Sequence, residues 1–295
     1  MVIKGIQLSR IVNTTKLPRI IEELKKIFSY NYEQGLFNTI KRYIYLINRL
    51  FQGKYKGYRK CNTEYHNFKH TLDTLLAVIR LIDGYNLSQD KIEADMSLNI
   101  LAAALLHDTG YIQQEWDIYG TGAKYTDEHV ERSKIFVQEN AQVFKIKVQD
   151  ISIINRLINC SGFNADLSEV AFSSNQEKIA GAILGTGDLL GQMSDRLYLE
   201  KLLFLYYEFR EAGIPGYNTE YDIIRKTVDF YELTKERFKT NFCNVYKYAR
   251  IHFRERCGHD ENIYMVAIER NINYIKKIIE DNSTNFRHKL NRVSF

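Results

Sequence analysis

The sequence contains few of the residues that interrupt helices or cross-link a chain. Only two prolines occur in 295 residues, and because proline breaks a helix interior, their scarcity favours long helices over a fold with many turns. No two of the four cysteines have the spacing of a zinc clip or a redox motif, so reduced thiols are expected. The longest nearly apolar stretch, residues 98–106, is about half of what a bilayer span needs. The first five residues show no secretory core. We therefore expect a cytoplasmic protein without a membrane partner.

Neither the composition nor the charge of the chain is extreme. Hydrophobic residues make up 45% and charged residues 26% of the sequence, which excludes disorder across the whole chain. The formal net charge of +5 suits an anionic substrate but is too small to indicate a nucleic-acid partner.

Period-two alternation of apolar and polar residues, the mark of a strand, is not convincing anywhere in the sequence. Apolar residues instead recur at the three-and-four spacing of a helix face, as Leu72, Leu75, Leu76 and Ile79 do. This pattern predicts one all-α domain with most aromatic side chains in its core or grooves. The predicted helices span residues 18–30, 35–52, 67–83, 90–108, 126–141, 147–160, 175–193, 195–212, 218–234, 238–256 and 261–281. The polar, basic tail after residue 282 is expected to fray.

The first candidate for chemistry is a pair of histidines around a predicted helix start. Asn67 is a suitable N-cap, which places His70 in the first turn and His66 just before the helix. His70 lies away from the apolar stripe of that helix, beside the small residues Thr74 and Ala77. His70 is therefore either a ligand facing a cavity or an exposed histidine near a helix start.

The second candidate is the His107–Asp108 pair, which follows a helix that is apolar nearly all round. Gly110 is expected to stop this helix. A carboxylate at such an end loses hydration on burial and faces the negative end of the helix dipole. A divalent cation would offset both costs, and adjacent imidazole and carboxylate groups suit it. The alternative is that Asp108 emerges into solvent or pairs with an arginine.

The third candidate is Asp188, which shares one helix face with Gly181, Gly185, Gln192 and Asp195. Glycine inside a helix costs up to about 1 kcal/mol relative to alanine. Its repetition here indicates a close helix contact that holds Asp188, or else tight packing beside an incidental surface carboxylate.

Further candidates lie between residues 111 and 129. Thr126 is expected to cap a helix that carries His129 near its start. His129 is either a ligand of a second metal ion, a donor to phosphate or a surface histidine. The connection over residues 111–125 is either a lid on which Trp116 stacks a base or a plain surface connection.

Three polar side chains complete the predicted set. Lys124 and Arg196 are candidates for neutralising phosphate charge, and Gln192 is a candidate substrate contact beside Asp188. The remaining histidines stand among charged residues, are expected to be solvated and are assigned no role. They are His252, His259 and His288.

The ordered set of His66, His70, the His107–Asp108 pair and Asp188 resembles the HD superfamily of metal-dependent phosphohydrolases. Residues 65–70 (Tyr-His-Asn-Phe-Lys-His) look like the variant found in class I cyclic-nucleotide phosphodiesterases. Residues 186–196 resemble bacterial HD proteins labelled metal-dependent phosphohydrolases. The likeness covers about residues 55–210.

The resemblance implies an all-α HD-domain bundle with a metal-binding core over residues 55–212. Residues 1–54 would then form helices packing on this core, and residues 213–295 would form further helices of the same domain.

The resemblance also implies roles for individual residues. His70, His107, Asp108 and Asp188 would hold one divalent metal ion. Asp108 would bridge to a second ion where one is present, and His66 would act as general acid. The reaction would be hydrolysis of a phosphate ester by a metal-activated water. Residues 109–111 (Thr-Gly-Tyr) lack the further histidine of the phosphodiesterases, so one or two ions, of Mn, Mg, Zn, Fe or Ni, remain open.

The substrate expected from this resemblance is a small phosphorylated molecule, such as a phosphodiester or a nucleotide. The oligomeric state is left open, a homo-oligomer included. Two alternatives to the hydrolase remain, namely a di-iron oxygenase on an HD scaffold and a non-catalytic nucleotide-binding protein. Imidazole and carboxylate ligands suit iron as well as zinc or manganese, so residue types alone do not separate the alternatives.

Overall fold

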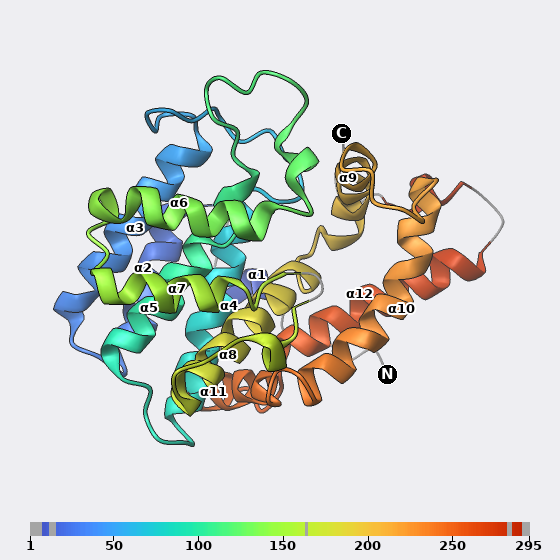
Figure 1. Cartoon of the computed structure of the whole chain (residues 1–295). Coiled ribbons are helices and arrows are strands. Elements are labelled where there is room, and N and C mark those ends of the chain that lie inside the picture. Colours follow the sequence, from blue (N-terminus) through green and yellow to red (C-terminus); the bar gives the residue numbers. More distant parts are fainter. Residues whose placement is uncertain (1–7, 12–15, 163–164, 282–284, 291–295) are drawn as a thin grey trace.

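The chain folds as an all-α protein, as predicted (Figure 1). The computed structural model describes residues 8–11, 16–162, 165–281 and 285–290. Within these ranges the only strand-like pairings are two isolated β-bridges. The α-helices are α1 (Leu8–Ile11), α2 (Leu17–Ser29), α3 (Phe37–Phe51), α4 (Phe68–Asn86), α5 (Ala94–Leu106), α6 (His129–Phe144), α7 (Val148–Ile158), α8 (Asn175–Met193), α9 (Tyr198–Glu211), α10 (Glu220–Lys239), α11 (Tyr248–Cys257) and α12 (Ile263–Glu280). Among the described residues, no helix combines the length and the apolar character that crossing a membrane requires.

The predicted cap of α4 is confirmed. Asn67 accepts a hydrogen bond from the backbone N–H of His70, as expected, and Ser174 caps α8 in the same way. The prediction of a helix over residues 238–256 is wrong in its first half. The chain leaves α10 at Lys239, and both Cys243 and Asn244 adopt a positive φ, which ends a helix, before α11 begins.

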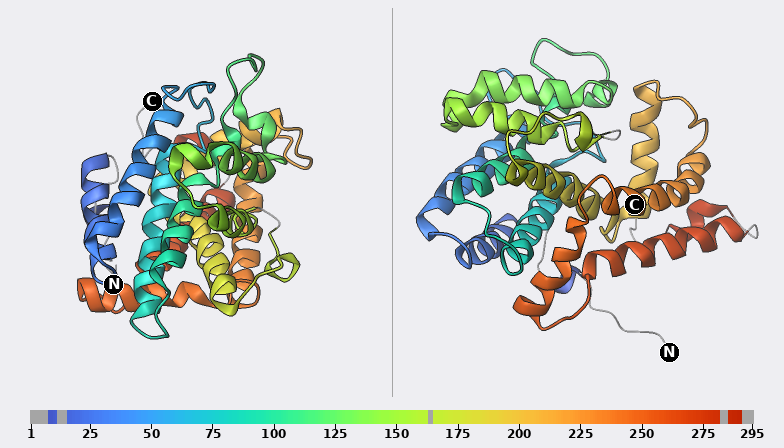
Figure 2. Two further views of the ribbon diagram at one scale, coloured as in Figure 1. Left: turned by 60° about the vertical axis from the view of Figure 1, so that its left-hand side comes forward. Right: turned by 60° about the horizontal axis from the view of Figure 1, so that its bottom comes forward.

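The centre of the molecule is the pair α4 and α8, which lie side by side and bury most of their residues (Figures 1 and 2). Glycines make this close approach possible. A Cβ atom added to Gly191 would lie 2.8 Å from the backbone nitrogen of Thr74, and one added to Gly187 would overlap Val78. The predicted glycines Gly181 and Gly185 serve a different contact, because they face Cys160 and its neighbours.

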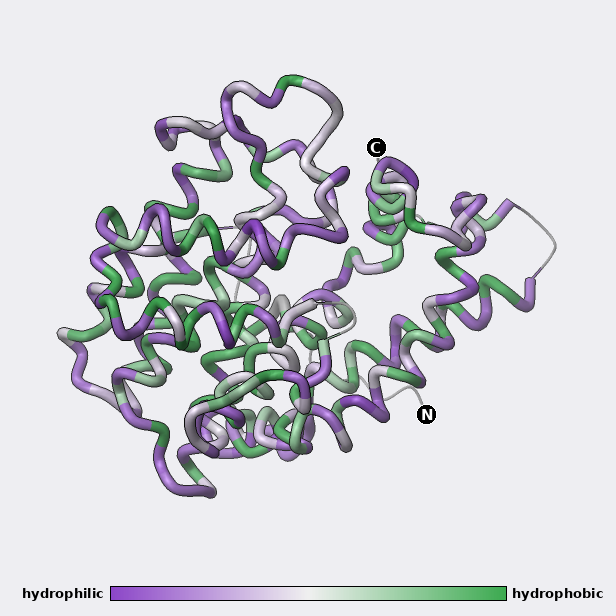
Figure 3. The backbone as a smooth tube through the Cα atoms, viewed as in Figure 1, coloured by the Kyte–Doolittle hydropathy of each residue, from purple (hydrophilic) through white to green (hydrophobic). Residues whose placement is uncertain are grey.

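Helices α9, α10 and α12 form an arm beside this core, whereas α11 packs on α4. Helix α10 packs against α9 and α12, and all three lie on the opposite side of the molecule from α6 and α7 (Figures 1 and 2). Green and purple segments alternate along α10 and α12 in Figure 3, as amphipathic helices require.

The expectation of a frayed tail is not met by residues 285–290, which contain the short 3₁₀ helix η6 (Phe286–Lys289). Arg287 pairs with Glu220, and Tyr274 donates a hydrogen bond to the carbonyl of Lys289. Residues 282–284 and 291–295 lie outside the described residues.

One histidine expected to be solvated is buried instead. His252 is 1% exposed, and its Nδ1 lies 2.7 Å from Oδ2 of Asp83, which is fully buried. Arg256 and Asn31 also donate to Asp83. This cluster ties α11 to the second half of α4. Because His252 and Asp83 are 169 residues apart in the sequence, no local pattern could predict their pairing.

Candidate metal centre

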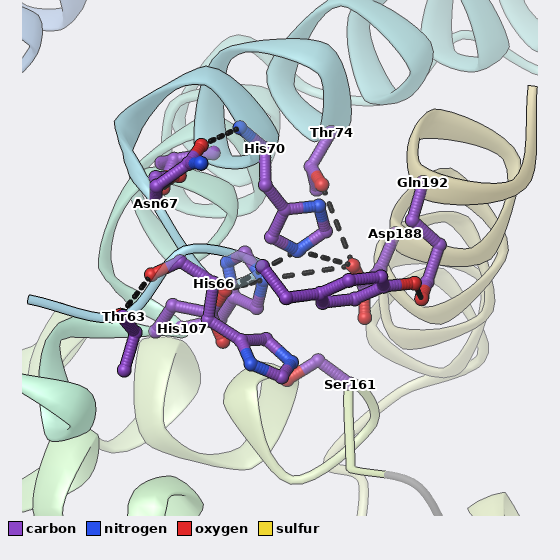
Figure 4. Close-up of polar contacts among 12 residues, drawn as sticks. Thr63, His66, Asn67, His70, Thr74, His107, Ser161, Asp188 and Gln192 are labelled. Carbon is purple, nitrogen blue, oxygen red and sulfur yellow. Dashed lines mark hydrogen bonds and ion pairs between the residues drawn. The ribbon is translucent and has the colours of Figure 1, made fainter. Parts of the chain in front are cut away.

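The predicted metal ligands converge from three separate segments (Figure 4). Nε2 of His70 lies 3.2 Å from Oδ2 of Asp108 and 3.1 Å from Oδ1 of Asp188. Nε2 of His107 lies 3.3 Å and 3.6 Å from the same two oxygens. All four side chains are buried. The alternatives of an exposed His70 and a solvated Asp108 are therefore wrong.

Each of these side chains is held by its own element. His70 lies in the first turn of α4, which the Asn67 cap begins. His107 follows α5 directly, and its Nδ1 lies 3.0 Å from the carbonyl of Ala104. A hydrogen bond from that nitrogen leaves Nε2 of His107 with a lone pair, the form in which imidazole binds a metal. Asp188 stands in the glycine-rich part of α8, and Thr74 donates to it across the α4–α8 contact at 3.4 Å.

Within the described residues, two buried polar atoms at this centre lie close to oppositely charged groups but make no well-aligned hydrogen bond. They are Nε2 of His107 and Oδ2 of Asp108. A buried polar atom without a partner costs about 1–3 kcal/mol, and more when it is charged. Two imidazoles and two carboxylates are suitable donors for a divalent transition metal ion, and such an ion would satisfy both atoms. The donor set therefore fits a metal ion.

Electrostatics within the cluster point the same way. Burial lowers the pKa of His70, but hydrogen bonds and charge from Asp108 and Asp188 outweigh it and raise the pKa to about 9. Burial raises the pKa of Asp188, but the two histidines outweigh it and hold the pKa below its usual range. Positive charge is thus favoured between the carboxylates, where a cation would take the place of the imidazole protons.

His66 lies beside this centre and is paired with a residue that the sequence did not suggest. Its Nδ1 is 2.6 Å from Oε2 of Glu208 in α9, whose other oxygen accepts a hydrogen bond from the backbone N–H of Tyr65. The ring of Tyr111 stacks on the ring of His66 at 4.2 Å between centroids. Glu208 stands in an ordinary helical pattern 142 residues away, so no motif marks it.

His129 also stacks on Tyr111, with the two ring centroids 4.7 Å apart, and its ring centroid lies 6.3 Å from that of His66. Its Nδ1 is 2.6 Å from the carbonyl of Thr126, and burial lowers its pKa. It lines the same cavity as His70, but it is not one of the three residues, His70, His107 and Asp108, whose ligand atoms lie together in the described part of the chain. Asp188 is also outside that group of three, although its Oδ1 lies 3.1 Å from Nε2 of His70. The roles expected for His129, as ligand of a second metal ion or donor to phosphate, stay predictions.

Two local predictions around His129 are wrong. Helix α6 begins at His129 itself, and the Thr126 hydroxyl bonds to the carbonyl of Ala123 instead of capping it. Helix α5 ends at Leu106, before Gly110. Gly110 is needed for a close approach, since a Cβ there would lie 2.8 Å from the carbonyl carbon of His129.

The centre opens into a cavity of about 820 Å³ between the core and the α9–α10 arm. Gln192 lines this cavity, and its Oε1 accepts a hydrogen bond from the Tyr65 hydroxyl at 2.7 Å. The cavity also extends past the predicted core of residues 55–212, because Ile214, Lys226 and Arg237 line it.

The structure does not bring the other predicted substrate contacts to the cavity. Lys124, Arg196 and Trp116 are not among its lining residues. Lys124 is paired with Asp117, and Trp116 is 75% exposed on a loop that stands away from the centre. Residues 111–125 thus correspond more closely to the surface connection than to the lid.

Arg237 in α10 is a cavity residue that sequence reasoning missed. Its Nη2 donates to the carbonyl of Ala165 at 3.0 Å. Burial lowers its pKa, and Asp188 and Asp166 partly oppose this through their charge. A cation that senses the charge of Asp188 is placed to interact with an anion bound at the centre.

Part of the chain matches a known family model. Residues 115–250, somewhat less than half of the chain, match a family model described as Npun_R2479-like. The matched segment contains Asp188, Glu208 and Arg237, but it begins after the His107–Asp108 pair and does not include it. No curated protein matches the chain.

Proposed function

We propose that this chain is a metal-dependent hydrolase of phosphate esters, related to the HD superfamily through its His70, His107, Asp108 and Asp188 set. The observation that carries the proposal is the meeting of these buried side chains at the end of a large cavity, with two polar atoms that make no aligned hydrogen bond. A cluster with a structural role alone would be expected to align these atoms in hydrogen bonds within the protein.

The four side chains would hold the cation through Nε2 of the two histidines and through carboxylate oxygens. When bound, a divalent cation supplies Lewis-acid polarisation of a phosphoryl oxygen and lowers the pKa of water. The chain itself supplies burial, which strengthens every charge interaction at the centre.

His66 is placed to move a proton. Since its Nδ1 faces Glu208, the opposite nitrogen, Nε2, is the one that can give a proton to the leaving oxygen of an ester. Glu208 pairs with Nδ1 of His66, and the Tyr111 ring stacked on the imidazole restricts its orientation. Arg237, rather than Lys124 or Arg196, is the cavity cation suited to an anionic substrate.

The first prediction tests the centre itself. His70→Ala and Asp188→Ala should each abolish metal retention and lower the hydrolysis of bis(p-nitrophenyl) phosphate to background, because each removes a ligand. Elemental analysis and release of p-nitrophenolate measure the two effects. His259→Ala, a histidine outside the cavity, serves as the matched control and should change neither.

Three results would contradict the proposal. Metal content and turnover that survive both substitutions would mean that the centre is misassigned. Oxygen uptake by the iron-loaded protein without ester hydrolysis would favour the oxygenase. Tight retention of a nucleotide without turnover in any metal would favour a binding protein.

A further inference from the structure

The cavity has two chemically different parts. One end carries the polar groups of the metal centre, together with His66, His129 and Gln192. The wall formed by α9, α10 and the segment between them is apolar. Its residues are Leu202, Leu205, Phe209, Ile214, Tyr217 and Phe230. We call this wall the apolar chamber.

The apolar chamber is larger than the proposed hydrolysis needs. A phosphate group and the two ions that an HD-type centre can hold would occupy only the polar end, whereas the whole cavity measures about 820 Å³. This size is near the upper range of pockets that enclose a complete organic ligand, about 300–1,000 Å³. The remaining space therefore requires an explanation in terms of the substrate's organic part.

Three side chains of the chamber are only partly covered by the protein. Leu205, Phe209 and Phe230 are half-buried, whereas Leu202 in the same wall is buried. Apolar surface facing an open cavity forgoes about 25 cal/mol per Å² that burial would return. An apolar ligand would restore this burial, whereas a polar sugar or a second phosphate would not.

The few cations of the chamber do not change its character. Lys226 donates to the carbonyl of Gly216, and its ammonium lies 4.5 Å from the centre of the Tyr217 ring. Arg237 also lines the cavity, and its guanidinium donates to the carbonyl of Ala165. Positive charge is therefore available in the cavity for a phosphoryl group, while Leu205 and Phe209 present hydrocarbon.

We propose that the substrate is an amphiphilic phosphate ester, whose phosphoryl group sits at the metal centre and whose long alkyl or aryl group fills the apolar chamber. This inference deepens the proposed function and rests on it for the position of the phosphoryl group. The chamber itself can be tested without turnover.

The kinetic test uses phosphodiesters that share one leaving group. Methyl, butyl and octyl p-nitrophenyl phosphate release the same p-nitrophenolate, so chemistry is constant while the apolar group lengthens. We expect kcat/KM to rise with chain length by up to about four-fold per methylene until the chamber is filled. Wild-type protein suffices for this series, so the result does not depend on the folding of a variant.

A pair of matched variants locates the effect. Leu205→Ser places a hydroxyl in the chamber, and Leu233→Ser makes the same change at a side chain of α10 that is 65% exposed and outside the cavity. Leu205→Ser should lower kcat/KM for the octyl ester about ten-fold and leave the methyl ester unchanged. Leu233→Ser should change neither.

A binding measurement separates this inference from the proposed function. Octyl phosphonate and methyl phosphonate have no ester bond to hydrolyse, and calorimetry should show at least ten-fold tighter binding of the octyl compound to the wild type. Equal binding, or equal loss in both serine variants, would overturn the apolar chamber whatever the hydrolase assay shows. Tight octyl binding without hydrolysis of any ester would retain the chamber and overturn the hydrolase.

Discussion

At the scale of single residues, the site divides into side chains that local sequence can mark and side chains that it cannot. The His107–Asp108 pair follows an apolar helix, and Asn67 is an N-cap that predicts the helix start in whose first turn His70 lies. Each of these features is visible within about ten residues. Glu208 and Arg237 reach the site because of where α9 and α10 lie in the fold. Helical periodicity predicts that these helices exist but not how they are arranged in space.

Glu208 provides a prediction at this scale. Glu208→Gln keeps a hydrogen-bonding group beside His66 but replaces the carboxylate that pairs with its Nδ1 by a neutral amide. We expect kcat to fall by about 10- to 100-fold for esters with an alkoxide leaving group, which need a proton. Esters of p-nitrophenol, whose leaving group needs none, should be hardly affected, and elemental analysis should show unchanged metal.

The control for this variant lies on the same helix. Glu211→Gln alters a carboxylate that bonds to Thr121 at the surface, so it should leave both kinds of ester unaffected. If Glu208→Gln slowed the two leaving groups equally, Glu208 would act on the fold of the site and not on proton transfer.

At the scale of elements, helix positions follow from apolar spacing and caps, so α8 occupies the predicted residues 175–193. The errors arise where other forces decide. The Thr126 hydroxyl satisfies a carbonyl of the preceding 3₁₀ turn, and the left-handed residues at 243 and 244 separate two helices that spacing alone had merged. The glycine spacing also did not predict which helix each glycine of α8 contacts, because packing partners depend on the arrangement of the helices in space.

The α4–α8 contact yields a prediction for stability. Gly191→Ala should destabilise the protein by about 1–3 kcal/mol, because the added methyl group would press on the backbone of Thr74. This loss would exceed the gain in helix propensity of about 1 kcal/mol that alanine normally brings. Urea denaturation would measure the change in the free energy of unfolding.

Gly35→Ala is the matched control for this substitution, since the nearest atom to its added Cβ is a side-chain oxygen of Glu33 at 3.6 Å. It should change stability little. Equal stability of both variants would mean that α4 and α8 can separate at no cost, contrary to their close approach.

At the scale of the whole molecule, the buried cluster around Asp83 joins α4 to α11 and makes stability depend on pH. Burial raises the pKa of Asp83, but hydrogen bonds from His252 and Arg256 outweigh it and lower the pKa. Burial also lowers the pKa of His252. The charge of Arg80 lowers this pKa further, whereas Asp83 and Glu23 raise it without outweighing burial. His252 is therefore neutral in the fold near pH 7 and donates from Nδ1 to Asp83.

The sign of the effect follows from these directions. The unfolded chain binds a proton at residue 252 near its ordinary pKa of about 6.5, whereas the folded chain binds it only at lower pH. The contribution of His252 to stability is thus complete above that pH and decreases as the pH falls toward the folded pKa. Asp83 stays ionised throughout this window, because its own pKa lies below the ordinary carboxyl range.

His252→Asn tests this linkage, since asparagine can keep a donor toward Asp83 but does not titrate. We expect the variant to be less stable than the wild type at pH 7.5 and the difference to shrink as the pH falls to 5.5. Urea unfolding of both proteins at each pH measures it, and the titration of His70 and His107 cancels because both proteins retain those residues. A difference that stays constant with pH would mean that His252 titrates alike in the folded and unfolded chains, and the cluster would then owe its stability to packing and to the Arg256–Asp83 pair.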